Sequence, residues 1–135
     1  MARYIAIIDY ADGMYGAHFP DAPGCTAMGA SEEEAIGNAV DALSEWAAEE
    51  YGSGRALAQP RSYAQLLKSG DYPELGKGGL IATIPLILES GKPTRANISM
   101  DTGILAAIDD EAARRGITRS AFLASAAREK IKEGA

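Results

Sequence analysis

The stretch that decides the fold is residues 94–132, and it begins with the run Arg95-Ala96-Asn97-Ile98-Ser99-Met100. Polar and apolar side chains alternate along this run, which is the period-two pattern of a β-strand. Ala96, Ile98 and Met100 would face one side of that strand, and the polar side chains the other. Because the same segment offers no second strand, we expect this one to pair with its copy in another chain.

Two helices are predicted after that strand. Asp101 is a favourable N-cap for the first helix, and Gly116 follows its predicted end. Thr118 is the corresponding N-cap of the second helix. One strand and two helices in about forty residues bury little apolar surface by themselves. The segment therefore predicts an obligate dimer.

The order of strand, helix, Gly-x-Thr-Arg-Ser and helix resembles the ribbon-helix-helix family of DNA-binding domains. In that family the paired strands enter the major groove as a two-stranded ribbon. The resemblance implies that three polar strand residues face base edges and that the amides at the start of the second helix hold a phosphate. The base-facing residues would be Arg95, Asn97 and Ser99, and the phosphate site would lie at Thr118, Arg119 and Ser120. The alternative is that the polar strand residues are only the solvated face of an edge strand.

The composition is that of one or two small domains with a packed core, since 47% of the 135 residues are hydrophobic. The sequence has neither an apolar run of membrane-spanning length nor the pattern of a signal peptide at its start. Its single cysteine, Cys25, allows neither an intrachain disulfide framework nor a zinc cluster. We therefore expect a cytoplasmic protein that does not associate with membranes.

The net charge of −6 is unevenly distributed. Residues up to Ser90 carry 5 basic and 13 acidic side chains, whereas those from Gly91 on carry 8 basic and 6 acidic ones. The tail can thus approach a phosphate backbone, while the front would be repelled by nucleic acid and would suit a basic protein. Acidic segments are common in ordinary proteins, so the charge alone does not identify the partner.

The front ninety residues predict a small sheet with one long helix across it. Strands are expected over residues 1–9, 14–19, 26–28 and 80–88. The long helix would begin at a capping box formed by Ser31 and Glu34, and a short helix at a second box formed by Ser62 and Gln65. Pro85 predicts that the last strand is an edge strand or is bulged. Residues 89–94 would be the linker between two domains, 1–90 and 91–135.

The front half contains the predicted hairpin and the motifs Phe19-Pro20-Asp21-x-Pro23-Gly24-Cys25 and Gly29-Ala30-Ser31-x-Glu33-Glu34-Ala35. In these features it resembles the HicB family of antitoxins. The resemblance implies an α+β fold, in which a small antiparallel sheet and one long helix form a partial ribonuclease H-like fold. A ribbon-helix-helix domain would follow, an arrangement known in that family.

The same resemblance implies a function. HicB-like proteins bind and neutralise HicA-like toxins, which are small basic proteins that cleave messenger RNA, and their tails repress the operon that encodes the pair. The implied partners are a HicA-like toxin, operator DNA and a second copy of the chain, with a tetramer left open. Toxin contacts are expected in the Pro/Gly loop or on the long helix: Phe19, Asp21, Pro23, Gly24 and Trp46.

Two other functions stay open: a metal-dependent, ribonuclease H-like nuclease tethered to DNA, and a repressor whose front domain senses a small ligand. Nuclease chemistry needs several carboxylates around two metal ions about 4 Å apart. The acidic candidates do not follow strand ends in a pattern that predicts convergence: Asp9, Asp12, Asp21, Glu33 and Glu34. His18 has no nucleophile nearby, and Cys25 is expected to be a small packed residue. We therefore expect no catalytic residue, metal or cofactor.

Overall fold

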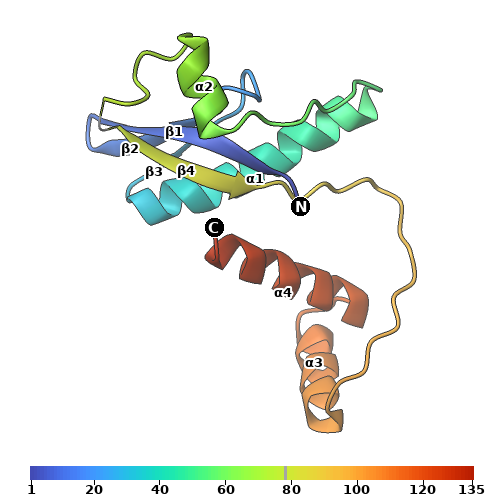
Figure 1. Ribbon diagram of the computed structural model, residues 1–135. Coiled ribbons are helices and arrows are strands. Elements are labelled where there is room, and N and C mark those ends of the chain that lie inside the picture. Colours follow the sequence, from blue (N-terminus) through green and yellow to red (C-terminus); the bar gives the residue numbers. More distant parts are fainter. Residues whose placement is uncertain (78) are drawn as a thin grey trace. The chain divides into compact units, whose positions relative to one another are not determined.

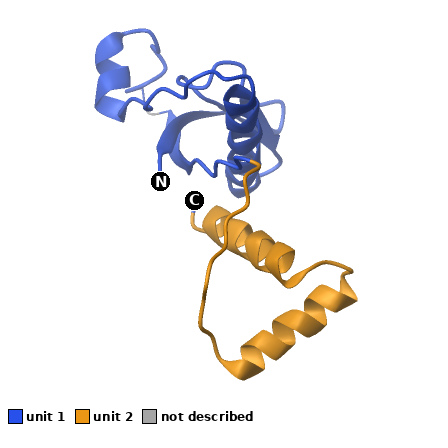
Figure 2. Ribbon diagram, turned by 90° about the vertical axis from the view of Figure 1, so that its right-hand side faces the viewer, with its two compact units in different colours: residues 1–90, 135 blue, residues 91–134 orange. Residues whose placement is uncertain are grey.

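The computed structural model describes residues 1–77 and 79–135, and it divides the chain into two compact units (Figures 1 and 2). The first unit is Met1–Ser90 and the second is Gly91–Gly134. Among the described residues, no helix combines the length and the apolar character that crossing a membrane requires.

The first unit is built on an antiparallel sheet of four strands in the order β3-β2-β1-β4. The strands are β1 (Arg3–Ala11), β2 (Met14–His18), β3 (Thr26–Gly29) and β4 (Leu80–Pro85). The prediction that the proline strand is an edge strand is confirmed, since β4 pairs only with β1. β4 ends at Pro85, earlier than predicted, opposite Arg3 where β1 begins, and one further backbone bond follows, from the Leu86 N–H to the Ala2 carbonyl at 2.9 Å.

The long helix α1 (Glu32–Gly52) crosses one face of this sheet (Figure 1). As predicted, Ser31 is its N-cap, and the hydroxyl of Ser31 accepts a hydrogen bond from the Glu34 N–H at 3.1 Å. This is one half of the predicted capping box, and the bonds described for this helix do not include the reciprocal one from the Ser31 N–H to the Glu34 side chain. Buried residues recur every three or four positions along its inner face: Ala35, Ala39, Val40, Leu43 and Ala47. Gly29 permits the close approach of β3 to this helix, because a Cβ there would lie 2.8 Å from the Glu34 carbonyl carbon.

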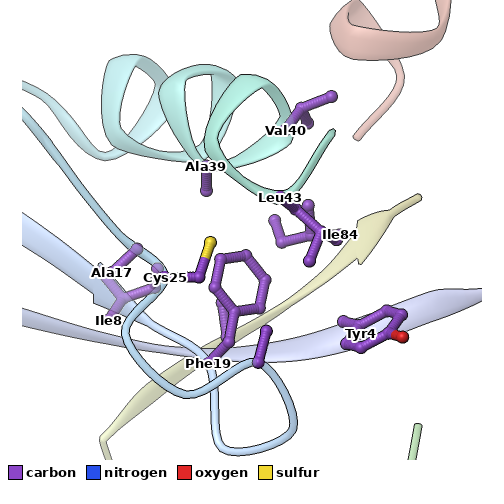
Figure 3. Close-up of a cluster of buried hydrophobic side chains, with 11 residues drawn as sticks. Tyr4, Ile8, Ala17, Phe19, Cys25, Ala39, Val40, Leu43 and Ile84 are labelled. Carbon is purple, nitrogen blue, oxygen red and sulfur yellow. The ribbon is translucent and has the colours of Figure 1, made fainter. Parts of the chain in front are cut away.

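The short helix α2 (Tyr63–Ser69) lies on the other face of the sheet (Figure 1). It begins at the predicted capping box, in which Ser62 and Gln65 bond to each other's backbone amides. Side chains of β1 alternate between the two faces, so the strand is buried on both. Tyr4, Ala6 and Ile8 join the core beneath α1, whereas Ile5 and Ile7 pack with Leu66 of α2. Figure 3 shows the larger of these two clusters.

The second unit consists of α3 (Thr102–Arg114) and α4 (Arg119–Glu133) with an extended approach segment. The predicted caps are confirmed: the Asp101 carboxylate accepts from the N–H groups of Gly103 and Ile104, and Thr118 caps α4. Gly116 adopts a φ of 69°, a left-handed conformation that favours glycine and ends α3.

Residues 92–101 form no regular secondary structure in the single chain. Ile98 is 64% exposed there, and Met100 is half-buried. The strand predicted over residues 95–100 was expected to need a second chain, so it stays a prediction.

Candidate functional site

The first candidate site is a hollow between the loop that follows β2 and one side of α1, which we call the loop–helix hollow. It has a volume of about 250 Å³. Its walls come from both elements: Gly24, Cys25 and Thr26 from the loop and the start of β3, and Ala42, Glu45, Trp46 and Glu49 from α1. The sequence left the loop and the helix as alternative contact surfaces, and the fold brings Gly24 and Trp46 into one depression.

The loop is held in place by side chains that point into the core. Phe19 is 3% exposed and Cys25 is 5% exposed, and both pack beneath α1 (Figure 3). The Cys25 N–H also donates to the Ala22 carbonyl at 3.0 Å, which closes the turn. Phe19 therefore supports the loop from below, while Pro23 and Gly24 are exposed at its surface.

Asp21 ties this loop to a distant part of the chain. Its carboxylate accepts hydrogen bonds from the Arg61 backbone N–H at 2.6 Å and from the Arg61 Nε at 2.8 Å. The Arg61 guanidinium also lies 5.9 Å from the centre of the Tyr72 ring. The Asp21 side chain thus fixes the segment between α1 and α2 against the loop.

The loop–helix hollow is acidic and contains an aromatic ring. Glu45 and Glu49 are exposed, and neither forms a salt bridge within the described part of the chain. Trp46 is half-buried, with its ring centre 6.4 Å from that of Tyr4 in an edge-on arrangement. Burial, and secondly the negative charge of Glu45, raise the pKa of the Cys25 thiol to about 11. Cys25 is therefore protonated at neutral pH and is no activated nucleophile.

The second candidate site is an open groove in the second unit, which we call the tail groove. Its volume is about 470 Å³. It is lined by the approach segment and both helices: Ala96, Asn97, Ile98, Met100, Leu105, Arg119, Ser120 and Leu123. Three of the six residues predicted to bind DNA, namely Asn97, Arg119 and Ser120, thus meet at one place. Arg95 and Ser99 are exposed nearby in sequence but do not line the groove.

Two side chains at the start of α4 are already engaged within the unit. The Thr118 hydroxyl accepts a hydrogen bond from the Ala121 N–H at 3.1 Å. The Arg119 guanidinium makes two bonds of 2.8 Å to the Asp109 carboxylate, and its hydrogen bond lowers the pKa of Asp109. The Arg119–Asp109 contact joins α4 to α3, whereas the Thr118 bond caps α4 itself. The phosphate contact predicted at this place involves backbone amides and not these side chains.

The acidic residues considered for metal chemistry remain dispersed. Across residues 1–77 and 79–135, no three His, Cys, Asp or Glu side chains are placed to hold a metal ion together. The His18 Nε2 lies 3.5 Å from a Glu74 carboxylate oxygen, so the histidine faces an acidic group rather than a nucleophile.

Glu45 and Glu49 were not among the residues that the sequence singled out. A signal for them was present: two glutamates four positions apart lie on the same side of a helix, and they flank the chain's single tryptophan. Arg61 could not have been found, because its contact with Asp21 spans 40 residues of sequence.

Comparisons with known proteins support the α+β fold of the chain. The sequence profile of one family, described as the HicB-like antitoxin of bacterial toxin–antitoxin systems, matches residues 4–127. A crystal structure of the antitoxin HicB from Burkholderia pseudomallei is similar with a TM-score of 0.57 and 30% identity, over 96% of this chain and 98% of that one. A crystal structure of antitoxin HicB3 is similar with a TM-score of 0.54 and 28% identity, over 96% of this chain and 97% of that one.

A HicA3–HicB3 toxin–antitoxin complex contains a chain of the same fold. That chain has a TM-score of 0.51 and 20% identity, over 63% of this chain and 98% of its own length. Comparison with curated proteins finds no match.

Proposed function

This chain belongs to the HicB-like antitoxin family, and on that premise we propose that its first unit binds and neutralises a HicA-like toxin while its second unit binds operator DNA. The protein would act in the cytoplasm as an antitoxin and as a repressor of its own operon.

The loop–helix hollow is the observation that carries the toxin-binding half of this proposal. It combines exposed carboxylates at Glu45 and Glu49 with the half-buried ring of Trp46, beside the exposed Pro23 and Gly24. Complementary charge speeds the encounter with a basic protein, and buried aromatic contacts set how long the complex lasts. The surface therefore suits a small basic toxin better than a nucleic acid.

The tail groove supports the second half of the proposal. Ala96, Ile98 and Met100 line it together with Leu105 and Leu123, so the groove carries apolar side chains that the single chain leaves open, beside the polar side chains of Asn97, Arg119 and Ser120. We propose that a second copy fills it, with residues 95–100 of the two chains paired as an antiparallel ribbon. Dimers can associate further into tetramers.

The DNA contacts would follow from that pairing. Arg95, Asn97 and Ser99 would present their side chains to base edges in the major groove, where arginine and asparagine read guanine and adenine. The backbone amides at Thr118, Arg119 and Ser120 would hold a phosphate at the start of α4. The net charge of the tail, positive in contrast to that of the front, is compatible with such contacts.

Co-expression with the protein encoded by the adjacent reading frame tests the proposal. We expect a small basic protein that arrests growth when expressed alone, that co-purifies with this chain, and that cleaves RNA only when the chain is absent. The purified chain should also retard DNA from upstream of its own gene. An adjacent protein that neither arrests growth nor binds the chain would contradict the proposal, as would magnesium-dependent RNA cleavage by the purified chain itself.

A further inference from the structure

We propose that the loop–helix hollow is a socket for one arginine side chain of the toxin, bonded by Glu45 and Glu49 and stacked on Trp46. This inference rests on the proposed toxin binding, and it names the chemical group that the hollow recognises.

The geometry of the hollow matches a long cationic side chain. Glu45 and Glu49 lie one helical turn apart on α1, so their carboxylates project from the same side of the helix with Trp46 beside them. Gly24 and Thr26 form the opposite wall. One water molecule takes about 30 Å³ in the liquid, so a hollow of about 250 Å³ has room for several waters or one long side chain.

The negative charges of Glu45 and Glu49 destabilise the chain when no partner is bound. Like charges four residues apart on a helix repel each other. Glu49 also lies in the last stretch of α1, where negative charge opposes the helix dipole, and the last turn carries no basic residue. The Arg55 guanidinium donates a hydrogen bond to Glu50 at 2.7 Å, and the charge of Glu49 has only a smaller effect on it. Binding one cation would relieve both repulsions, which is the pattern expected where stability is sacrificed for function.

Arginine fits this arrangement better than lysine. Its guanidinium is planar, so it can stack on the Trp46 ring while its N–H groups point sideways to two carboxylates. An ammonium group is a compact and strongly hydrated charge, and it would leave the aromatic face largely unused.

Trp46 is the only tryptophan of the chain, so its fluorescence reports on this site alone. The full chain is titrated at constant ionic strength with the peptide acetyl-Gly-Arg-Gly-amide, up to millimolar concentrations. The matched peptide carries citrulline, which has the shape of arginine without its charge. We expect a saturable change in Trp46 emission with the arginine peptide only. Equal responses to both peptides, or no response to either, would overturn the socket.

The carboxylates are tested with the double variant Glu45→Gln/Glu49→Gln. Its control is Glu33→Gln, an exposed glutamate in the first turn of the same helix. Circular dichroism and the thermal midpoint verify that both variants fold. The double variant should lose the response to the arginine peptide, and the control should keep it. A full response in the double variant contradicts the assignment.

The adjacent-frame toxin provides the second readout. The double variant should release it at least about tenfold faster than the wild type, because interface changes act mainly on dissociation. If the toxin binds the double variant and the wild type equally well, Glu45 and Glu49 do not bind its arginine. The proposed antitoxin function is not affected by that result. If the adjacent protein does not bind even the wild type, the proposed function fails, and the peptide titration still decides whether the hollow takes arginine.

Discussion

The two units of this chain differ in how much apolar surface each buries by itself. In the first unit, β1 is buried on both faces, and α1 contributes Leu43 with no exposed area. In the second unit, Ala112 is the only buried residue among those described, while Ile98 is 64% and Ile104 58% exposed. Since a segment of roughly forty residues rarely holds a core alone, we propose that the first unit folds independently and that the second needs another copy.

The largest effect is expected from Ile98→Asp, which would abolish the dimer formed by the second unit and leave the first unit folded. In the proposed dimer, Ile98 is buried between two chains, and an unpaired buried charge costs several kcal/mol. Sedimentation of the variant should show a monomer, and DNA retardation should be lost.

The control for that experiment is Met28→Asp, in β3 of the first unit. Met28 is 58% exposed, similar to Ile98 in the single chain, but it has no place in the proposed dimer. This variant should remain dimeric. A dimeric Ile98→Asp chain would contradict the ribbon pairing.

The next largest effect concerns core truncations in the two units. Leu43→Ala should lower the free energy of unfolding of the first unit by about 2–5 kcal/mol, because it leaves a cavity in a closed core. Leu105→Ala, which alters the wall of the tail groove, should destabilise the second unit in a way that depends on chain concentration. Denaturant unfolding at several concentrations separates the two. If the unfolding midpoint of the second unit does not change with chain concentration, the second unit does not need another copy to fold.

A smaller effect is expected from the residues proposed to read DNA bases. Arg95→Ala and Asn97→Ala should each weaken operator binding by about 1–3 kcal/mol without loss of the dimer, since both side chains are exposed. Arg114→Ala is the control, because that arginine bonds to Glu111 at the end of α3. Operator affinity is measured by retardation at a fixed salt concentration. If the Arg95→Ala/Asn97→Ala double variant binds as the wild type does, another surface reads the operator.

The smallest effect concerns alkaline stability of the first unit. Burial raises the pKa of Cys25 from 9.0 to about 11, so between these pH values the folded chain binds more protons than the unfolded one. The thiol's contribution to stability is therefore present below pH 9 and declines as the pH rises toward 11. Unfolding free energies under reducing conditions should show this decline in the wild type and less of it in Cys25→Ala. If the unfolding free energies of the wild type and Cys25→Ala decline equally with pH, the Cys25 thiol does not cause the alkaline loss of stability.

Local signals in the sequence predicted the helices of both units and the strands of the first. The caps at Ser31, Ser62, Asp101 and Thr118 are short-range chemistry, in which a side chain bonds to an amide a few residues away, and the structure has all four. The antiparallel sheet was implied by the predicted hairpin and the family resemblance, and its edge strand by proline's missing N–H at Pro85.

The candidate sites were harder to predict because they depend on contacts distant in sequence. The loop–helix hollow joins Gly24 to Glu49, and the Asp21–Arg61 contact holds its loop from 40 residues away. No local sequence pattern predicts contacts between residues so far apart in the sequence. Residues 95–100 were predicted as a strand from alternation alone, and one chain cannot show a pairing that needs two.

The division of labour between the units is the central claim, and growth rescue tests it most directly. Cells expressing the adjacent-frame toxin would receive residues 1–90, the full chain, or the full chain with Arg95→Ala and Asn97→Ala. The account predicts that all three restore growth, with residues 1–90 soluble and bound to the toxin. Soluble residues 1–90 that fail to bind it and to restore growth, or rescue that requires Arg95 and Asn97, would contradict the account.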